Sequence, residues 1–255
     1  MAGKTTRNRA SRSVPMRTAA MIAVSLNATP VMAGGQSATE CLEWITKADA
    51  ILASTDSYTS IFHKRELIHG RLAPEEVAFM KFKKPFKVYM KWTGKERRGT
   101  EAIYVEGWNG GHLKAHEGGI LNIINFNLDP RGSLAMRGNR HPITDSGLEH
   151  LMTLIGENVR RGLKAREMVF RDLGTETVYG RASRKLEGIF PREQERGYYC
   201  YRAVLYMDVE RAIPLKMLLY DWDDVLFEDY GYEDTRLNAG LTDADFDPGN
   251  PAYRF

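Results

Sequence analysis

The sequence predicts an α+β fold that is mainly β, with one extensive antiparallel sheet curled over helices. Three observations lead to this prediction. Phe86, Val88, Met90 and Trp92 alternate with polar or amphipathic residues, as in a half-buried strand. Two separate segments repeat apolar residues at helical spacing. No Gly/Ser-rich linker and no internal repeat divides residues 34–255, so we expect these residues to form a single domain.

Two helices are expected, one ahead of the strands and one among them. The first covers residues 38–53, and its apolar stripe consists of Leu42, Ile45, Ala48 and Leu52. The second opens at Thr144 or Asp145, either of which can cap it, and ends near Gly162. Its apolar stripe consists of Leu148, Leu151, Ile155 and Val159.

The strands are expected on both sides of the second helix. Four precede it, at residues 76–83, 86–92, 101–106 and 120–126. Four follow it, at residues 177–187, 198–208, 215–221 and 225–232. Residues 207–214 read as a hairpin connection between two of them. Sequential strands of this kind favour antiparallel neighbours.

The positive charge of the chain is concentrated in its first residues. The whole chain has 36 Lys and Arg against 33 Asp and Glu, a net charge of +3. Five basic residues and no acidic ones lie within residues 1–33, so the remainder has 31 basic residues against 33 acidic ones, a net charge of −2. A nucleic-acid partner is therefore not expected, because such a partner needs a basic surface.

Residues 1–33 have the pattern of an export signal. The basic part ends at Arg17, a short apolar run covers residues 18–26, and Val31-Met32-Ala33 offers small residues for cleavage near Ala33. The alternative is a disordered basic tail. No later segment approaches the ~20 apolar residues of a membrane span. We therefore expect a periplasmic protein that is not an integral membrane protein.

Two cysteines, Cys41 and Cys200, remain after the predicted signal. In an oxidising compartment they could form a disulfide. They could equally be two buried thiols that act as small hydrophobic side chains. The sequence leaves both possibilities open.

Three histidines in glycine-rich stretches raise the question of a metal site. His112 and His116 share one face whether the segment is helical or extended, and His141 could supply a third ligand for zinc. The flanking glycines, however, favour turns around a short strand. We therefore expect these stretches to be architectural, with no metal or cofactor. In that interpretation Arg140 faces an acid or the carbonyl end of a strand.

The acidic segment near the end of the chain, residues 242–249, partly matches a calcium-binding loop. Its glycine stands one place late, and Arg254 occupies the position of the bidentate Glu. A solvated acidic tail is the expected structure instead.

Three strings carry a resemblance to a known family, namely YVEGWNGGHLKAHEGG (104–119), LDPRGSLAMRGNRHPIT (128–144) and GLTDADFDP (240–248). They resemble motifs of the bacterial domain-of-unknown-function 1571 family, over residues 55 to 248. That family is grouped with the LolA-like proteins, which are periplasmic lipoprotein carriers and their relatives. The resemblance implies a half-open antiparallel barrel, a LolA-like half-barrel, whose concave face is covered by helices. It provides no catalytic residues.

The expected function is therefore binding rather than catalysis. A strongly curled sheet has a concave side too wide for its own side chains to fill, and if the helices fill it incompletely an apolar groove remains that suits acyl chains. The residues expected to line this groove are Phe86, Val88, Met90, Trp92, Leu151, Ile155, Tyr199, Tyr201, Leu205, Met207, Leu215, Met217 and Leu219. The alternative is that these residues form a fully packed core.

The predicted function is a non-enzymatic, carrier-like protein of the bacterial envelope that binds a lipid or an acylated protein. Neither a nucleophile elbow nor a Cys–His signature is present in the sequence. A second possibility is an envelope sensor or interaction domain that docks another envelope protein. A third is a metal-assisted hydrolase that uses His112, His116 and His141.

Overall fold

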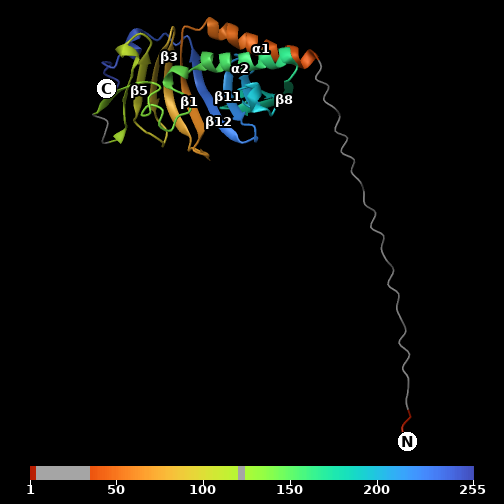
Figure 1. Ribbon diagram of the computed structural model, residues 1–255. Helices are drawn as coiled ribbons and strands as arrows, with labels where there is room; N and C mark the ends of the chain where they lie inside the picture. Colours follow the sequence, from red (N-terminus) through yellow and green to blue (C-terminus); the bar gives the residue numbers. More distant parts are fainter. Residues whose placement is uncertain (4–34, 120–123) are drawn as a thin grey trace. The chain divides into compact units, whose positions relative to one another are not determined.

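The computed structural model describes residues 1–3, 35–119 and 124–255. Apart from its first three residues, the predicted export signal lies outside the described residues, as do residues 120–123 of one predicted strand. Two α-helices are present in the described part, α1 (Gly35–Ala53) and α2 (Leu148–Ala165). Both lie over one face of a large sheet and run side by side (Figure 1).

The sheet has twelve strands in the described part of the chain, and all neighbours are antiparallel. In chain order they are β1 (Ser57–Ile68), β2 (Arg71–Leu72), β3 (Glu76–Lys83), β4 (Lys87–Trp92), β5 (Glu101–Val105), β6 (Leu113–His116), β7 (Asn125–Leu128), β8 (Val169–Val178), β9 (Arg181–Ile189), β10 (Arg202–Asp208), β11 (Pro214–Tyr220) and β12 (Leu226–Leu237). Their spatial order is β7-β6-β5-β4-β3-β1-β12-β11-β10-β9-β8, with β2 paired to β1. The sheet is therefore open, with β7 and β8 as its outer strands, which confirms the predicted fold class.

Register places one continuous set of side chains on the face that the helices cover. At the centre of the sheet, β1 pairs with β12 through Phe62 and Tyr232, Lys64 and Tyr230, and Glu66 and Glu228. Because side chains alternate along a strand, all six lie on the same face. Further out, Met80 pairs with Met90 and Met90 with Ala102, which extends this face across β3, β4 and β5. We call it the concave face.

The two helices bury their apolar stripes against the concave face and each other. In α1 the predicted residues Ile45, Ala48 and Leu52 are buried. In α2 the buried residues include Leu151 and Val159 from the predicted stripe. The helical spacing read from the sequence thus identified the packed sides of both helices.

The predicted cap of α2 is wrong. Thr144 and Asp145 belong to a short 3₁₀ turn, η3 (Ile143–Asp145), and α2 begins after Gly147. Gly147 has φ of 111°, and a Cβ there would lie 3.0 Å from the Tyr58 hydroxyl. That hydroxyl accepts a hydrogen bond from Leu148 N at 2.8 Å. A side chain from β1 therefore caps the helix, which local sequence does not reveal.

The single strand predicted at residues 177–187 is also wrong, because it spans a hairpin. Tyr179 and Gly180 both have positive φ, of 49° and 74°, and join β8 to β9. β8 was missed because it is an outer strand whose residues are mostly exposed or half-buried, so it lacks an apolar alternation.

The C-terminal segment is not a solvated tail. Thr242 and Asp245 form a capping box on η5 (Asp243–Phe246), and Lys81 Nζ donates to Asp245 Oδ1 at 2.7 Å. Phe246 is buried, and Tyr253 stacks on Tyr89 with ring centroids 4.1 Å apart. The segment therefore seals the convex face of β4 and β5. For this reason β4, predicted to be half-buried, is covered on both sides.

Cys41 and Cys200 are both free and buried. Burial raises the pKa of each thiol to about 12. Of the two possibilities that the sequence leaves open, the structure has the buried thiols.

Candidate functional site

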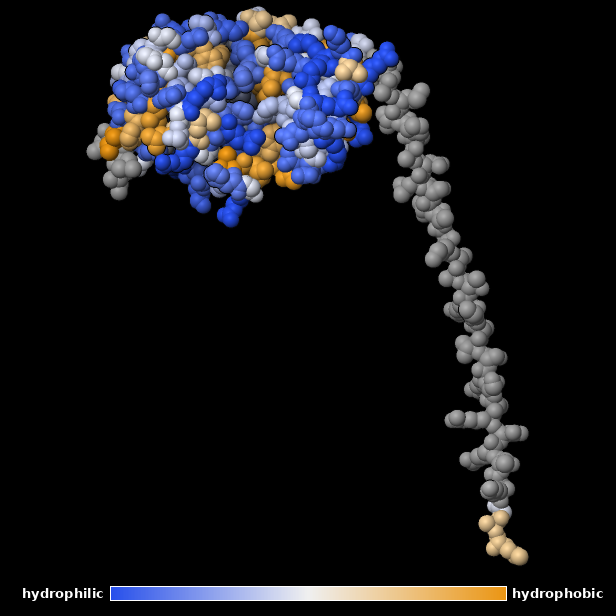
Figure 2. All heavy atoms as spheres, in the orientation of Figure 1, coloured by the Kyte–Doolittle hydropathy of each residue, from blue (hydrophilic) through white to orange (hydrophobic). Residues whose placement is uncertain are grey.

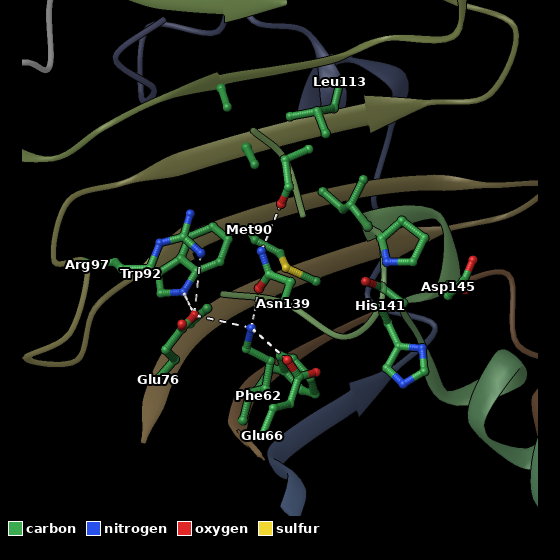
Figure 3. Close-up of a pocket in the computed structure, with 18 of the residues that line it drawn as sticks. Phe62, Glu66, Glu76, Met90, Trp92, Arg97, Leu113, Asn139, His141 and Asp145 are labelled. Carbon is green, nitrogen blue, oxygen red and sulfur yellow. Dashed lines mark hydrogen bonds and ion pairs between the residues drawn. The ribbon is translucent and has the colours of Figure 1, made fainter. Parts of the chain in front are cut away.

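A cavity of about 510 Å³ lies on the concave face, between the β3–β7 half of the sheet and the loop of residues 128–147. Residues from β1, β11 and β12 and from the start of α2 complete its wall. The volume falls within the ~300–1,000 Å³ typical of small-molecule sites. Figure 3 shows a close-up of the side chains that line it.

One part of the cavity is apolar. Its lining comes from β4 to β7 and from the loop, and consists of Met90, Ala102, Leu113, Ala115, Phe126, Leu128, Leu134 and Ala135. Phe126 and Leu134 are 39% and 57% exposed, so the cavity opens to the surface beside them. In the space-filling view, apolar residues gather at the end of the sheet where β5 lies (Figure 2).

The opposite part of the cavity is polar and deeply buried. Glu66 and Glu228, directly opposite each other on β1 and β12, are 3% and 1% exposed. Arg140 joins them, since its backbone N donates to Glu66 Oε2 at 2.9 Å and its Nε donates to Glu228 Oε1 at 2.9 Å. The Tyr230 hydroxyl donates to Glu66 Oε1 at 2.5 Å. Of the two partners predicted for the Arg140 guanidinium, an acid or a strand carbonyl, the structure has both, because the guanidinium also donates to Leu67 O at 3.4 Å.

Three donors converge on the same oxygen of Glu228. Besides Arg140, the Tyr199 hydroxyl donates to Oε1 at 2.7 Å, and His141 Nε2 lies 3.0 Å from it. Burial, together with Glu228, raises the pKa of Tyr199 well above its ordinary value, so the hydroxyl keeps its proton. The other oxygen, Glu228 Oε2, is buried and has no partner among the described residues.

Glu228 also affects the pKa of His141. Burial lowers the pKa of its imidazole, but the hydrogen bond and charge of Glu228, with smaller contributions from Glu66 and Asp145, outweigh burial. The net result is a pKa raised above the ordinary value.

A second ion-paired group lies beside Glu66. Trp92 Nε1 donates to Glu76 Oε2 at 2.6 Å, and Lys64 Nζ lies 3.6 Å from the same oxygen (Figure 3). Lys64 also pairs with Glu66 at 3.7 Å and donates to Asn139 of the loop. Lys64 is thus shared between two carboxylates and an amide oxygen, and it ties the loop to β1.

The predicted groove residues divide between two places. Met90, Trp92, Leu151 and Met217 line the large cavity. Ile155, Tyr199, Leu205, Met217 and Leu219 line a second space of about 50 Å³ between the two helices and β8–β11. That space has about a tenth of the volume of the large cavity, which makes this half of the concave face nearly filled.

The other five predicted groove residues line neither space. Val88, Met207 and Leu215 are at most 1% exposed and belong to the packed interior. Phe86 packs edge-on against Phe82. Tyr201 lies ahead of β10, where Arg192 stacks on its ring at 4.1 Å.

One string that the sequence interpretation had quoted contributes several cavity residues that were not predicted. LDPRGSLAMRGNRHPIT was interpreted as turn chemistry, yet the structure puts it along the cavity wall. The lining residues from it are Leu128, Leu134, Ala135, Arg137, Asn139, His141, Pro142 and Ile143. Apolar and cationic residues interleaved in a loop are the signal that could have indicated this role.

The three histidines have separate partners. His112 Nδ1 lies 3.2 Å from Gly110 O, and His116 Nδ1 lies 3.0 Å from Glu117 O. The His116 ring also packs edge-on against Phe255, on the convex side. His141 pairs with Glu228 on the concave side. No group of three or more His, Cys, Asp or Glu within the described ranges is placed to hold a metal ion.

The glycine turns that flank these histidines are present as predicted. Gly110, Gly111, Gly119 and Gly138 all have positive φ, between 62° and 79°. Gly118 is required for a different reason, because a Cβ there would lie 2.0 Å from Arg98 O.

Comparison with known families agrees with this fold. The model of the family described as "Protein of unknown function (DUF1571)" matches residues 55–255. The chain belongs to this family. The resemblance inferred from the three sequence strings is therefore confirmed. No curated protein matches the chain significantly.

Solved structures show a more distant likeness. A complex of Pseudomonas aeruginosa MucA and MucB matches with 16% identity and a TM-score of 0.44, over 84% of this chain and 61% of that chain. The Mycobacterium tuberculosis lipoprotein LppX matches with 12% identity and a TM-score of 0.47, over 80% and 98%. A LolA superfamily protein from Nitrosomonas europaea matches with 13% identity and a TM-score of 0.33, over 81% and 96%. At these values the function has to be argued from this chain's own residues.

No helix in the described part of the chain is long and apolar enough to cross a bilayer.

Proposed function

We propose that this family member binds the acyl chain of a lipid or of a lipidated protein in the cavity on the concave face, and that it does so without catalysis. The observation that carries the proposal is a cavity of about 510 Å³ with an apolar part that opens to the surface beside Phe126 and Leu134. An apolar chain gains roughly 0.8 kcal/mol for each methylene that it removes from water, so a space of this kind favours alkyl ligands.

The lining supports adaptable rather than shape-specific binding. Met90 of β4 and Met217 of β11 both line the cavity, and methionine side chains adjust to varied apolar partners. Ala102 and Ala115 also line the cavity, and their small side chains leave space between the sheet and the loop. Replacing these alanines by a large side chain is therefore the most direct way to remove the space.

The test compares one alanine in the open half with one in the filled half. Both Ala115 and Ala203 are half-buried strand residues, and they line the large and the small space respectively. We expect Ala115→Trp to weaken binding of the neutral fluorescent probe N-phenylnaphthylamine by about tenfold or more, equivalent to ~1.4 kcal/mol. Its melting temperature should stay close to that of the wild type.

Ala203→Trp serves as the control. It should cost about 1–3 kcal/mol of stability through overpacking, while the folded fraction keeps its probe affinity. Equal probe binding by the wild type and Ala115→Trp contradicts the proposal.

We also propose that residues 1–33 direct export and are removed near Ala33. The support is the acid-free basic segment that ends at Arg17 and the small residues that follow it. The N-terminus of the protein isolated from the cell envelope tests this point, and retention of Arg7 to Arg17 there contradicts it.

A further inference from the structure

The polar end of the cavity lacks a hydrogen-bond donor. All three donors that reach Glu228 use Oε1, and Oε2 is left without a partner among the described residues, although the residue is 1% exposed. A buried acceptor that is left unsatisfied is destabilising, and more so when the acceptor is charged. Something that donates therefore belongs beside Glu228.

The protein's own cations at this end are already committed. Lys64 is shared by Glu66, Glu76 and Asn139. The Arg97 guanidinium pairs with Glu76 at 3.6 Å and lies over the Trp92 ring at 4.3 Å. Arg140 spans Glu66 and Glu228. Among the residues that the structure describes, no cation at this end is therefore left over to receive an anionic group.

The register of the sheet adds a second constraint. Glu66 and Glu228 are directly opposite each other on β1 and β12, where like charges repel. An incoming carboxylate would add a third acceptor to this pair, in surroundings where screening by water is weak. An ammonium or hydroxyl group would instead relieve the repulsion.

We propose that the cavity takes its ligand with the head group at the Glu66–Glu228 end, and that this head group is a hydrogen-bond donor, a primary ammonium or a hydroxyl, rather than a free carboxylate. The alkyl chain then lies along Met90, Ala102 and Leu113 towards the opening beside Phe126. This inference rests on the proposed function, since it names the class of amphiphile that the same cavity selects.

The experiment uses three dodecyl ligands that differ only in the head group. Dodecylamine, dodecanol and dodecanoate compete with N-phenylnaphthylamine for the purified protein at neutral pH and below their micelle concentrations. We expect dodecylamine and dodecanol to bind at least about tenfold more tightly than dodecanoate. Only the first two can donate a hydrogen bond to the Glu228 carboxylate.

Glu228→Gln tests which residue sets the preference, and Glu233→Gln is its matched control. Glu233 is on the same strand and also pairs with a histidine, with Oε2 2.9 Å from His63 Nε2, but it does not line the cavity. Glu228→Gln should reduce the difference between amine and carboxylate to less than about threefold, because an amide offers its own donor. Glu233→Gln should leave the difference unchanged.

Two further variants keep the test decisive. If Glu228→Gln does not fold, Glu66→Gln on the facing strand replaces it and should shift the preference in the same direction. A variant of Arg137 tests the reverse orientation of the ligand, with its head group at the opening. Arg137 lines the cavity at the exposed loop. Tighter binding of dodecanoate that Arg137→Glu abolishes overturns the inference and places the head group at the opening.

The inference and the proposed function fail in different ways. Equal binding of all three dodecyl ligands, or a preference that survives Glu228→Gln, contradicts the inference but leaves acyl-chain binding in place. Failure of all three to displace the probe contradicts acyl-chain binding itself, and the inference with it.

Discussion

The two halves of the concave face differ in what covers them. Over β8–β11 both helices pack on the sheet, and only about 50 Å³ remains between them. Over β3–β7 a loop without regular helix covers the sheet, and about 510 Å³ remains. A helix presents a continuous apolar stripe at close distance, whereas the loop is held off the sheet by a few polar contacts. The same sheet thus has a packed core at one end and a cavity at the other.

The contacts that hold the loop are themselves the polar end of the cavity. Asn139 accepts from Lys64, and Arg140 and His141 reach Glu228. These side chains make the loop dependent on the buried carboxylates below it. Charge in this half therefore has the role that apolar packing has in the other.

The largest expected difference between the halves comes from truncating one methionine in each. Met207, 0% exposed on β10, belongs to the filled half, and Met207→Ala should cost about 2–5 kcal/mol because it leaves a new void. Met90 on β4 already borders empty space, so Met90→Ala should cost only about 1–2 kcal/mol. Chemical denaturation measures both. Equal losses contradict the distinction.

A smaller effect is expected at the β10–β11 connection of the filled half. Burial by itself raises the pKa of Asp208, but hydrogen bonds from Arg181 and Arg211 outweigh it and lower the pKa to about 2. The resulting stability is present above the ordinary carboxyl pKa and is lost as the pH falls through about 2. At neutral pH Asp208→Asn should therefore cost about 2 kcal/mol, at 1.36 kcal/mol per unit of pKa.

The control for Asp208 is the pH dependence of the loss. Unfolding at a series of pH values should show wild type and Asp208→Asn converging in strong acid. A constant difference down to the lowest pH would falsify the electrostatic explanation.

The smallest expected effect has the opposite pH dependence and lies in the open half. His141 has a raised pKa, so its contribution is fully present below the ordinary histidine pKa and is lost as the pH rises through the raised value. His141→Gln should therefore destabilise the protein in mildly acidic buffer and have less effect in alkaline buffer. Thermal unfolding across this pH range measures the change.

His150 provides the comparison for His141. It also lines the cavity, but it has no ion pair or hydrogen bond among the described residues. His150→Gln should leave the pH profile of stability as in the wild type. If both variants change the profile alike, the pairing of His141 with Glu228 is not the cause.

The sequence predicted the helices and most central strands because their burial follows a regular period. The stripe of α1 is a local pattern that appears in the structure, and the strand predicted at residues 86–92 is present as β4, although it is covered on both sides. The start of α2 was not predictable in this way, because its cap is the Tyr58 hydroxyl, from a strand 90 residues earlier. β8 was not predicted for a related reason, because an outer strand carries little apolar pattern.

The site was predicted only in its class. An apolar groove on the concave face was expected, and Met90 and Trp92 line it. The polar end was missed because Glu66, Arg140 and Glu228 are far apart in sequence and meet only through the pairing of β1 with β12. Which apolar residues border space and which are packed depends on what covers them, and alternation does not contain that information.

The pairing of the first long strand with the last has a consequence for how the chain is made. Tyr58 pairs with Leu237, so the edge of β1 that pairs with β12 stays unpaired until residues 226–237 have been synthesised. Pairings between such distant residues form slowly, because a long loop must close first. Until β12 emerges, the two halves of the sheet remain unjoined. The export proposed for residues 1–33 would benefit from that delay.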